Sequence, residues 1–204
     1  MNFLIRVPLQ TSPEQHARLC ELRAVFARVC NELAPQVQQS RVWNRVALHH
    51  LHYRSLRVQY PALGSQMVCN AIYAVSRTAR LVFQSPASPF NVQKMGERPL
   101  PVLRFADTCP VYFDRHTLSL KVGKLSLFTL DGRMQFELTL APMQLALFET
   151  GKLREVVLRA KPQARLPAST VRRTLRVATS TSATWLALPK LTQAVLPSRV
   201  MTTP

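Results

Sequence analysis

The spacing of apolar residues differs between two long parts of this 204-residue chain, and the difference restricts the folds that it can adopt. From about residue 12 to 84, apolar side chains recur every three or four positions, which predicts amphipathic helices. From about 102 to 159 they alternate with polar ones, which predicts strands with one buried face. Proline-rich stretches interrupt the chain between the two patterns. We therefore expect an α+β protein with a linker or loop at 85–101.

The helical part, 12–84, starts with a clear signal. Ser12 and Gln15 have the spacing of a capping box, and Pro13 stands where a first helical turn tolerates proline. The first apolar stripe stops before Pro35, which predicts the end of that helix. This stripe consists of Leu19, Leu22, Phe26, Val29 and Leu33.

Two further helices follow. One is expected from about Arg41 to Tyr60, because the residue before a proline is biased away from helical geometry. The other is capped by Ser65 and ends near Gln84. Its stripe consists of Val68, Ile72, Val75, Ala79 and Val82. Three such helices can close a small bundle.

Strands are predicted on both sides of the helices, at 1–11 and within 102–160. Asp131-Gly132 is the strongest hairpin signal, because both residues tolerate the positive φ of a type I′ turn. We expect these strands to form one small antiparallel barrel with the three-helix bundle inserted. The alternating apolar positions include Ile5, Val7, Leu118, Leu120, Met134, Phe136, Leu138 and Leu140.

The last segment, 161–204, contains no Asp or Glu and has no sustained period. This composition predicts a poorly ordered basic tail. Two interpretations stay open: a low-complexity tail that contacts nucleic acid, and a sequence that has lost its original reading frame.

Charge supplies the main functional expectation. Twenty-seven Lys and Arg residues against 10 Asp and Glu give a formal net charge of +17 and, with a pI of about 11.2, favour a polyanionic partner. We expect nucleic-acid binding; the alternatives are a basic solvated surface and a ribosome-associated fragment. No apolar run approaches the roughly 20 residues that cross a bilayer, and the first 11 residues lack a signal-peptide pattern, so we expect a cytoplasmic protein without membrane contact.

Candidate phosphate contacts occur in both parts of the chain. On the second helix the apolar positions Val46, Leu51 and Leu56 are expected to face inward and to leave the basic side exposed, the alternative being a merely solvated face. The helical candidates are Arg41, Arg45, His49, His52, Arg54, Arg57, Arg77 and Arg80. Those of the strand part are Arg104, Arg115, His116, Lys121, Lys124 and Arg133.

Aromatic side chains on the helices can provide stacking platforms for bases. Tyr53, Tyr73 and Trp43 are the candidates, with core packing as the preferred interpretation of Trp43. We expect no metal site at His49, His50 and His52, because no Cys or carboxylate nearby completes a ligand set. The four cysteines form no C-x-x-C pair and are expected to be free thiols.

Several segments resemble, in the same order, the TnpB (OrfB) proteins of bacterial insertion sequences. They are 51–54 (LHYR), 60–68 (YPALGSQMV), 112–120 (YFDRHTLSL) and 127–133 (LFTLDGR), and the resemblance covers residues 1 to about 160. It implies the wedge-type barrel and inserted recognition helices of an RNA-guided DNA endonuclease related to the type V CRISPR effectors. In such a protein guide RNA pairs with target DNA, and the protein reads duplex shape and backbone.

The catalytic part of that family does not match this chain. A RuvC-like nuclease needs an Asp, Glu, Asp set to hold Mg²⁺, whereas the last acidic residue here is Glu155. We therefore expect no catalytic residue and no cofactor in this chain, Mg²⁺ being required only if a RuvC partner is supplied. Beyond Lys161 the sequence suggests a truncated or frame-shifted copy.

Three hypotheses about function remain open. The first is a nuclease-deficient binding module with guide RNA and DNA as partners. The second is a half-enzyme, which needs a separate nuclease polypeptide or a dimer. The third is a non-functional transposon remnant.

Overall fold

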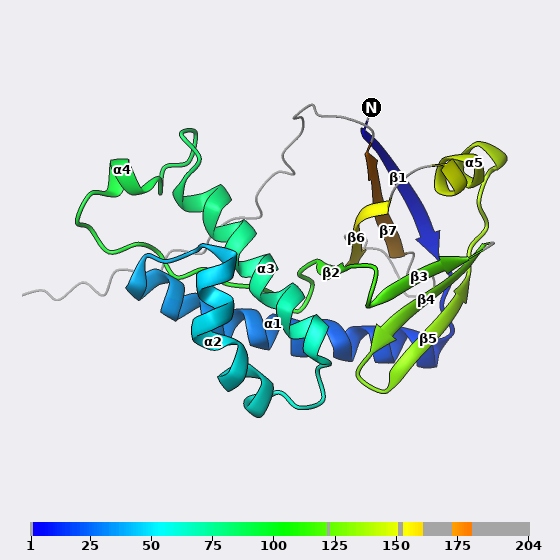
Figure 1. Cartoon of the computed structure of the whole chain (residues 1–204), viewed down its shortest axis with the longest axis horizontal. Coiled ribbons are helices and arrows are strands. Elements are labelled where there is room, and N and C mark those ends of the chain that lie inside the picture. The colour runs from blue at the N-terminus through cyan, green and yellow to red at the C-terminus, as the bar shows by residue number, and fades with distance from the viewer. Residues whose placement is uncertain (1, 122, 151–152, 161–172, 181–204) are drawn as a thin grey trace, which may run out of the picture.

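The computed structural model describes residues 2–121, 123–150, 153–160 and 173–180, in which helices and strands are mixed (Figure 1). The α+β class expected from the sequence is confirmed. The helices are α1 (Pro13–Ser40), α2 (Arg45–Gln59), α3 (Ser65–Phe83), α4 (Val92–Met95) and α5 (Pro142–Thr150). The strands are β1 (Asn2–Leu9), β2 (Val111–Phe113), β3 (Leu118–Lys121), β4 (Lys124–Thr129), β5 (Gly132–Glu137), β6 (Leu153–Ala160) and β7 (Arg173–Ser180).

The described strands form two antiparallel sheets. One has the order β1-β7-β6-β2, and the other has the order β3-β4-β5. Within the described residues these two sheets do not join into the expected single closed barrel. The chain passes from the first sheet to the second between β2 and β3, and it returns to the first between β5 and β6. The second change passes through α5, a helix in a region where strands alone were expected.

Strand β7 corrects the expectation of an unstructured tail. It lies between β1 and β6 and pairs antiparallel with both of them. With only one of these partners, β7 would have an unpaired edge. Pairing with both β1 and β6 satisfies the backbone N–H and C=O groups on its two sides. In the sequence only Leu175 and Val177 alternate within β7, a pattern too short to predict a strand. The rest of the expected tail, 161–172 and 181–204, lies outside the described residues.

Helix α1 is longer than predicted, because it continues past Pro35. Proline removes one helical hydrogen bond, but the following turn is held by the burial of Val37 and by Gln38. The Gln38 side-chain amide donates a hydrogen bond to the Leu100 carbonyl oxygen over 2.9 Å. The helix ends at Arg41, whose φ of 53° is the left-handed conformation of many helix C-caps.

The two following helices start at positions that their caps explain. Asn44 is the N-cap of α2, and its side chain accepts hydrogen bonds from two amides of the first turn, so that the helix starts after Asn44 and not at Arg41. At α3 the N-cap is Gly64 and makes no side-chain capping bond, so the predicted capping role of Ser65 is wrong. The predicted ends of both helices are confirmed to within a residue.

The hairpin between β4 and β5 is confirmed, but its turn differs from the prediction. Thr129 pairs with Gly132, so Leu130 and Asp131 form the loop. Gly132 has a φ of 90°, whereas Asp131 has no positive φ. A single left-handed glycine after the loop is typical of a type I turn with a bulge, so the predicted type I′ turn is wrong.

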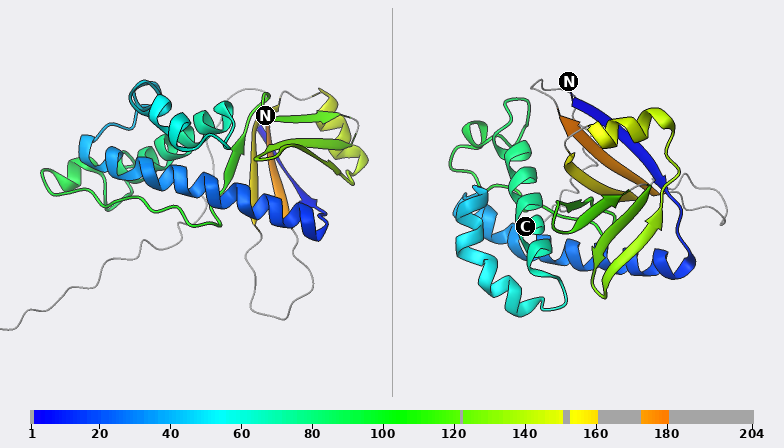
Figure 2. Two further views of the ribbon diagram at one scale, coloured as in Figure 1. Left: turned by 90° about the horizontal axis from the view of Figure 1, so that it is seen from below. Right: turned by 45° about the vertical axis from the view of Figure 1, so that its right-hand side comes forward.

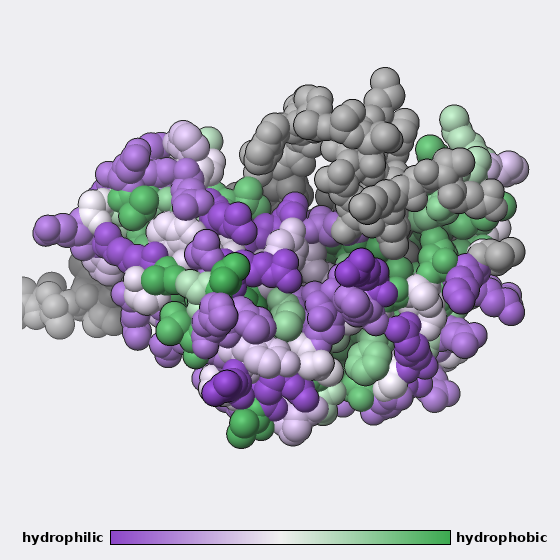
Figure 3. Space-filling view, viewed as in Figure 1, coloured by the Kyte–Doolittle hydropathy of each residue, from purple (hydrophilic) through white to green (hydrophobic). Residues whose placement is uncertain are grey.

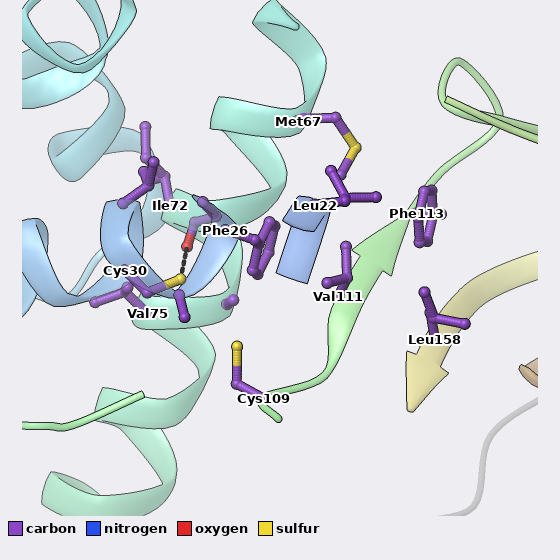
Figure 4. Close-up of a cluster of buried hydrophobic side chains, with 14 of the residues drawn as sticks. Leu22, Phe26, Cys30, Met67, Ile72, Val75, Cys109, Val111, Phe113 and Leu158 are labelled. Carbon is purple, nitrogen blue, oxygen red and sulfur yellow. Dashed lines mark hydrogen bonds between the residues drawn. The ribbon is translucent and has the colours of Figure 1, made fainter. Parts of the chain in front are cut away.

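Helix α1 joins the helical part to the sheets (Figures 1 and 2). Near its start, Arg18 forms an ion pair with Asp131 (Nε to Oδ2, 3.4 Å) and donates to Thr129 Oγ1 over 3.2 Å. Further along, α1 packs against α3, and α3 in turn contacts β2. The apolar stripes predicted for α1 and α3 are buried. Side chains of α1, α3, β2 and β6 meet in one core (Figure 4).

Candidate nucleic-acid interface

Helix α3 presents a polar stripe on the side away from its buried stripe. The residues of this α3 stripe recur at steps of three and four, which places them on one helix face. They are Gln66, Cys69, Tyr73, Arg77, Arg80 and Gln84. At 1.5 Å per residue the stripe extends roughly 27 Å. Figure 3 shows hydrophilic side chains along much of α3 on the face in view.

The first turn of α2 borders the middle of the α3 stripe. The guanidinium carbon of Arg45 lies 5.3 Å from the centroid of the Tyr73 ring, a cation–π contact. Beside this contact is an open hollow of about 310 Å³, lined by Arg45, Val46, His49, Gln66 and Cys69. The structure thus brings the predicted residues Arg45 and His49 together with α3.

Arg77 lies at the centre of a polar cluster on the stripe. Its Nη1 donates to Glu155 Oε1 over 3.0 Å and to Tyr73 Oη over 2.9 Å, and Tyr73 Oη donates to the same carboxylate oxygen. The guanidinium group also lies over the Tyr112 ring. Burial opposes the charge of Arg77, but nearby Glu155 and Tyr73 outweigh it and raise the pKa of Arg77, so the group stays cationic. Glu155 nevertheless neutralises much of its field.

The start of α3 reaches the turn before β3. The side-chain amide of Gln66 donates to Asp114 Oδ2 over 2.5 Å, and Asp114 Oδ1 accepts the backbone N–H of His116. Arg133 on β5 donates to the His116 carbonyl oxygen over 2.9 Å. This chain of contacts places Arg115, His116 and Arg133, predicted from the strand part, at the sheet end of the α3 stripe.

The orientation of α2 corrects the reasoning from its sequence. Leu56 is buried as expected, but Val46 and Leu51 are 62% and 63% exposed. The second buried position is Leu48, eight residues before Leu56, and these two leucines determine which side of α2 faces the core. The basic face formed by Arg45 and its neighbours therefore borders α3, while Val46 and Leu51 point to solvent.

Two predicted contact residues also hold parts of the fold together. Arg41 donates to the carbonyl oxygens of Gly96 and Arg98 over 2.9 and 3.0 Å, which ties the end of α1 to the loop after α4. Arg57 donates to the carbonyl oxygens of Tyr60 and Leu63 and closes the loop between α2 and α3. Both guanidinium groups have fixed positions.

Two predicted side chains on α2 are only partly exposed. Burial lowers the pKa of His52, so this histidine favours its neutral form. The Tyr53 ring stacks on His49 with 4.6 Å between ring centroids. Tyr53 therefore packs within its own helix, although its half-buried ring still borders the surface.

Four predicted cations are not brought to the α3 stripe. Arg54, Arg104, Lys121 and Lys124 are exposed, and within the described part of the chain their side chains make no hydrogen bond or ion pair. Lys121 and Lys124 are register partners on either side of the turn at Gly123. These side chains add to the positive electrostatic field of the surface, but no hydrogen bond or ion pair to the described residues holds them in a defined position for binding a ligand.

Sequence reasoning missed the ends of the α3 stripe and the carboxylate that pairs with Arg77. Gln66 and Gln84 continue the spacing of Tyr73, Arg77 and Arg80, and this period was a signal that could have identified them. Glu155 gave no such signal, because it lies 78 residues after its partner Arg77.

The charge of the two bordering helices favours an anionic ligand. Together α2 and α3 contain five arginines and no acidic residue. Guanidinium groups bind phosphate, and amide side chains and tyrosine rings suit bases, so the arrangement can hold a nucleic-acid strand. Across the described ranges, no group of three or more His, Cys, Asp or Glu residues could hold a metal ion. No helix among the described residues is long and apolar enough to cross a membrane.

No family model matches this chain, and no curated protein matches it either. The case for the interface therefore rests on its own geometry and charge.

Proposed function

We propose that this chain binds nucleic acid along the α3 stripe, as the guide-RNA- and target-DNA-binding half of a TnpB-like RNA-guided endonuclease. The observation that carries the proposal is the continuity of the stripe. It runs from the turn at Arg115, past Arg45 at the edge of α2, to Arg80 in the last turn of α3. A polar surface of this length, with Arg115, Arg45 and Arg80 along it, suits a row of phosphates better than a single small anion.

The order of the elements supports the same proposal. A strand, an inserted group of three helices and then several antiparallel strands follow one another, as the resemblance to the TnpB proteins implies. In this proposal the sheets act as the wedge-type barrel of that family, and α1 to α3 act as the recognition helices. Guide RNA and DNA are the proposed partners.

The proposal does not extend to cleavage by residues of this chain. After Glu155 there is no acidic side chain in the sequence to hold Mg²⁺. Cutting DNA would require further carboxylates, and a separate nuclease polypeptide is the proposed source. A frame-shifted copy of a nuclease gene would account for the absence of acidic residues after Glu155 as well.

The test compares two double variants that lose equal charge. Arg45→Gln with Arg80→Gln removes two arginines beside or on the stripe, neither of which forms an ion pair with the described residues. Arg6→Gln with Arg28→Gln removes two exposed arginines from β1 and α1 and serves as the matched control. RNA that co-purifies with the chain is sequenced and used as the probe, with bulk cellular RNA for comparison.

We expect the stripe variant to bind the probe on the order of tenfold or more weakly. The slope of its log affinity against log salt concentration should decrease by the equivalent of about two phosphate contacts. The control should change affinity much less. Equal losses in the two variants would refute the α3 stripe, and a flat salt response of the unmodified chain would refute nucleic-acid binding. A discrete structured RNA supports the TnpB-like assignment, whereas bulk RNA alone favours a transposon remnant.

A further inference from the structure

A second hollow lies at the end of the α3 stripe farthest from the β3 turn. It has a volume of about 510 Å³, within the range of roughly 300–1,000 Å³ that small-molecule sites occupy. The segment between α1 and α2 forms one wall, and the end of α3 forms the other. The lining residues are Arg41, Val42, Trp43, Asn44, Arg80 and Gln84.

The Trp43 ring is a fixed platform in this hollow. It packs against Phe83 with 5.6 Å between ring centroids and an angle of 45° between the planes. The Trp43 backbone is held too, because Ser76 Oγ donates a hydrogen bond to its carbonyl oxygen over 2.7 Å. A half-buried indole whose position is already set loses little freedom when a base stacks on it.

Two guanidinium groups lie beside the platform. Arg41 is anchored through the carbonyl oxygens of Gly96 and Arg98, so its charge is held in place at the hollow. Arg80, opposite it on α3, makes one long hydrogen bond to Ser76 Oγ over 3.4 Å and remains exposed. None of the described residues that line the hollow is acidic, so the two cations are not neutralised within it.

The hollow also contains amide groups that can contact a base edge. Asn44 Oδ1 accepts the amides of Val46 and Ala47, so its NH₂ group is the part left to donate. The Gln84 side chain is exposed and has no hydrogen bond to the described residues. An amide offers a donor or an acceptor to the edge of an unpaired base.

We propose that the Trp43 hollow binds one unpaired nucleotide of a single strand, with the base against the indole and its phosphate between Arg41 and Arg80. Bases within a duplex are stacked on both sides, so this hollow selects single-stranded nucleic acid. The inference rests on the proposed function, because the α3 stripe brings the strand to the hollow.

The chain has two tryptophans, so the test uses the full chain with Trp185→Phe, in which Trp43 is the remaining tryptophan. The probes are a short oligothymidylate, a strand of the same length whose residues all lack bases, and a duplex of that length. Trp43 emission and affinity are measured for each probe. Trp43→Leu and Trp43→Phe in the same chain are compared by affinity alone, after thermal unfolding shows that they are folded.

We expect oligothymidylate to quench Trp43 emission and to bind on the order of tenfold more tightly than the abasic strand. Trp43→Leu should abolish this difference, and Trp43→Phe should keep most of it. Equal affinities for the two strands with unchanged emission would overturn the inference while leaving the proposed function intact. If no probe binds at all, both are overturned. Since the emission readout uses Trp43 at its native position, failure of a Trp43 variant to fold does not affect it.

Discussion

Helices α1 and α2 are adjacent in the chain but have opposite character. Helix α1 buries 11 of its 28 residues and carries three arginines with three glutamates. Helix α2 buries only Leu48 and Leu56 among 15 residues and carries three arginines with no acidic residue. The two helices therefore have different places in the proposal: α1 connects the two parts of the fold, and α2 borders the proposed nucleic-acid interface.

The surroundings of each helix explain the difference. Helix α1 lies against the β4–β5 hairpin at one end and against α3 along its length, so few of its positions can carry unpaired charge. Helix α2 packs mainly on α3 and leaves Val58, at 82% exposure, in solvent. The scaffold therefore tolerates changes on α2 that it does not tolerate on α1.

The largest expected effect tests this contrast in stability. Phe26→Ala on α1 should lower the free energy of unfolding by about 3–5 kcal/mol, because a fully buried ring leaves a cavity. Leu51→Ala on α2 should lower it by less than about 0.5 kcal/mol, because the side chain is already exposed. Urea unfolding of both variants gives the comparison. Similar losses would show that α2 is packed more tightly than the structure indicates.

Next in size is the pH dependence of the core beside α1. Burial raises the pKa of the Cys109 thiol to about 11, from the ordinary 9.0. Between these values the folded chain holds the proton and the unfolded chain loses it, so stability should fall as pH rises from about 9 to about 11. Cys109→Ala should reduce that slope in urea unfolding without removing it, because burial also raises the pKa of the Cys30 thiol. Cys20→Ala, at an exposed position on α1, is the control and should leave the slope unchanged.

A smaller effect is expected on binding. Glu155→Gln removes the carboxylate that neutralises Arg77, so affinity for an RNA probe should rise a few-fold by electrostatics. Glu32→Gln, at an exposed position on α1, makes the same change in net charge away from the α3 stripe. Equal gains in the two variants would mean that net charge alone governs binding. A loss of affinity in Glu155→Gln would mean that this carboxylate is needed to orient Arg77.

The smallest effect should distinguish two histidines of α2. Burial lowers the pKa of His52, so the unfolded chain takes up a proton there before the folded chain does. The contribution of His52 to the free energy of unfolding should therefore be fully present above about pH 6.5 and decrease slightly as the pH falls below it. Thermal unfolding of His52→Gln should show a weaker decline. His50→Gln, at an exposed position, should decline as the unmodified chain does.

Local patterns were sufficient to predict most of the elements and part of the proposed interface. The helical period of α3 predicts both its buried stripe and the line of Tyr73, Arg77 and Arg80, because residues three and four apart must share a face. The capping box at Ser12 and the hairpin at Gly132 are also local, and both are present. Such features depend only on backbone geometry within a few residues.

Long-range packing decided the remainder. Which side of α2 meets α3 depended on Leu48, and the neutralisation of Arg77 depended on Glu155, 78 residues away. Strand β7 forms where β1 and β6 both offer unpaired edges, although its own sequence is barely patterned. Spacing along a chain determines which residues share a face, but the partner of that face is chosen by the contacts that bury the most apolar surface and satisfy the most backbone and charged groups.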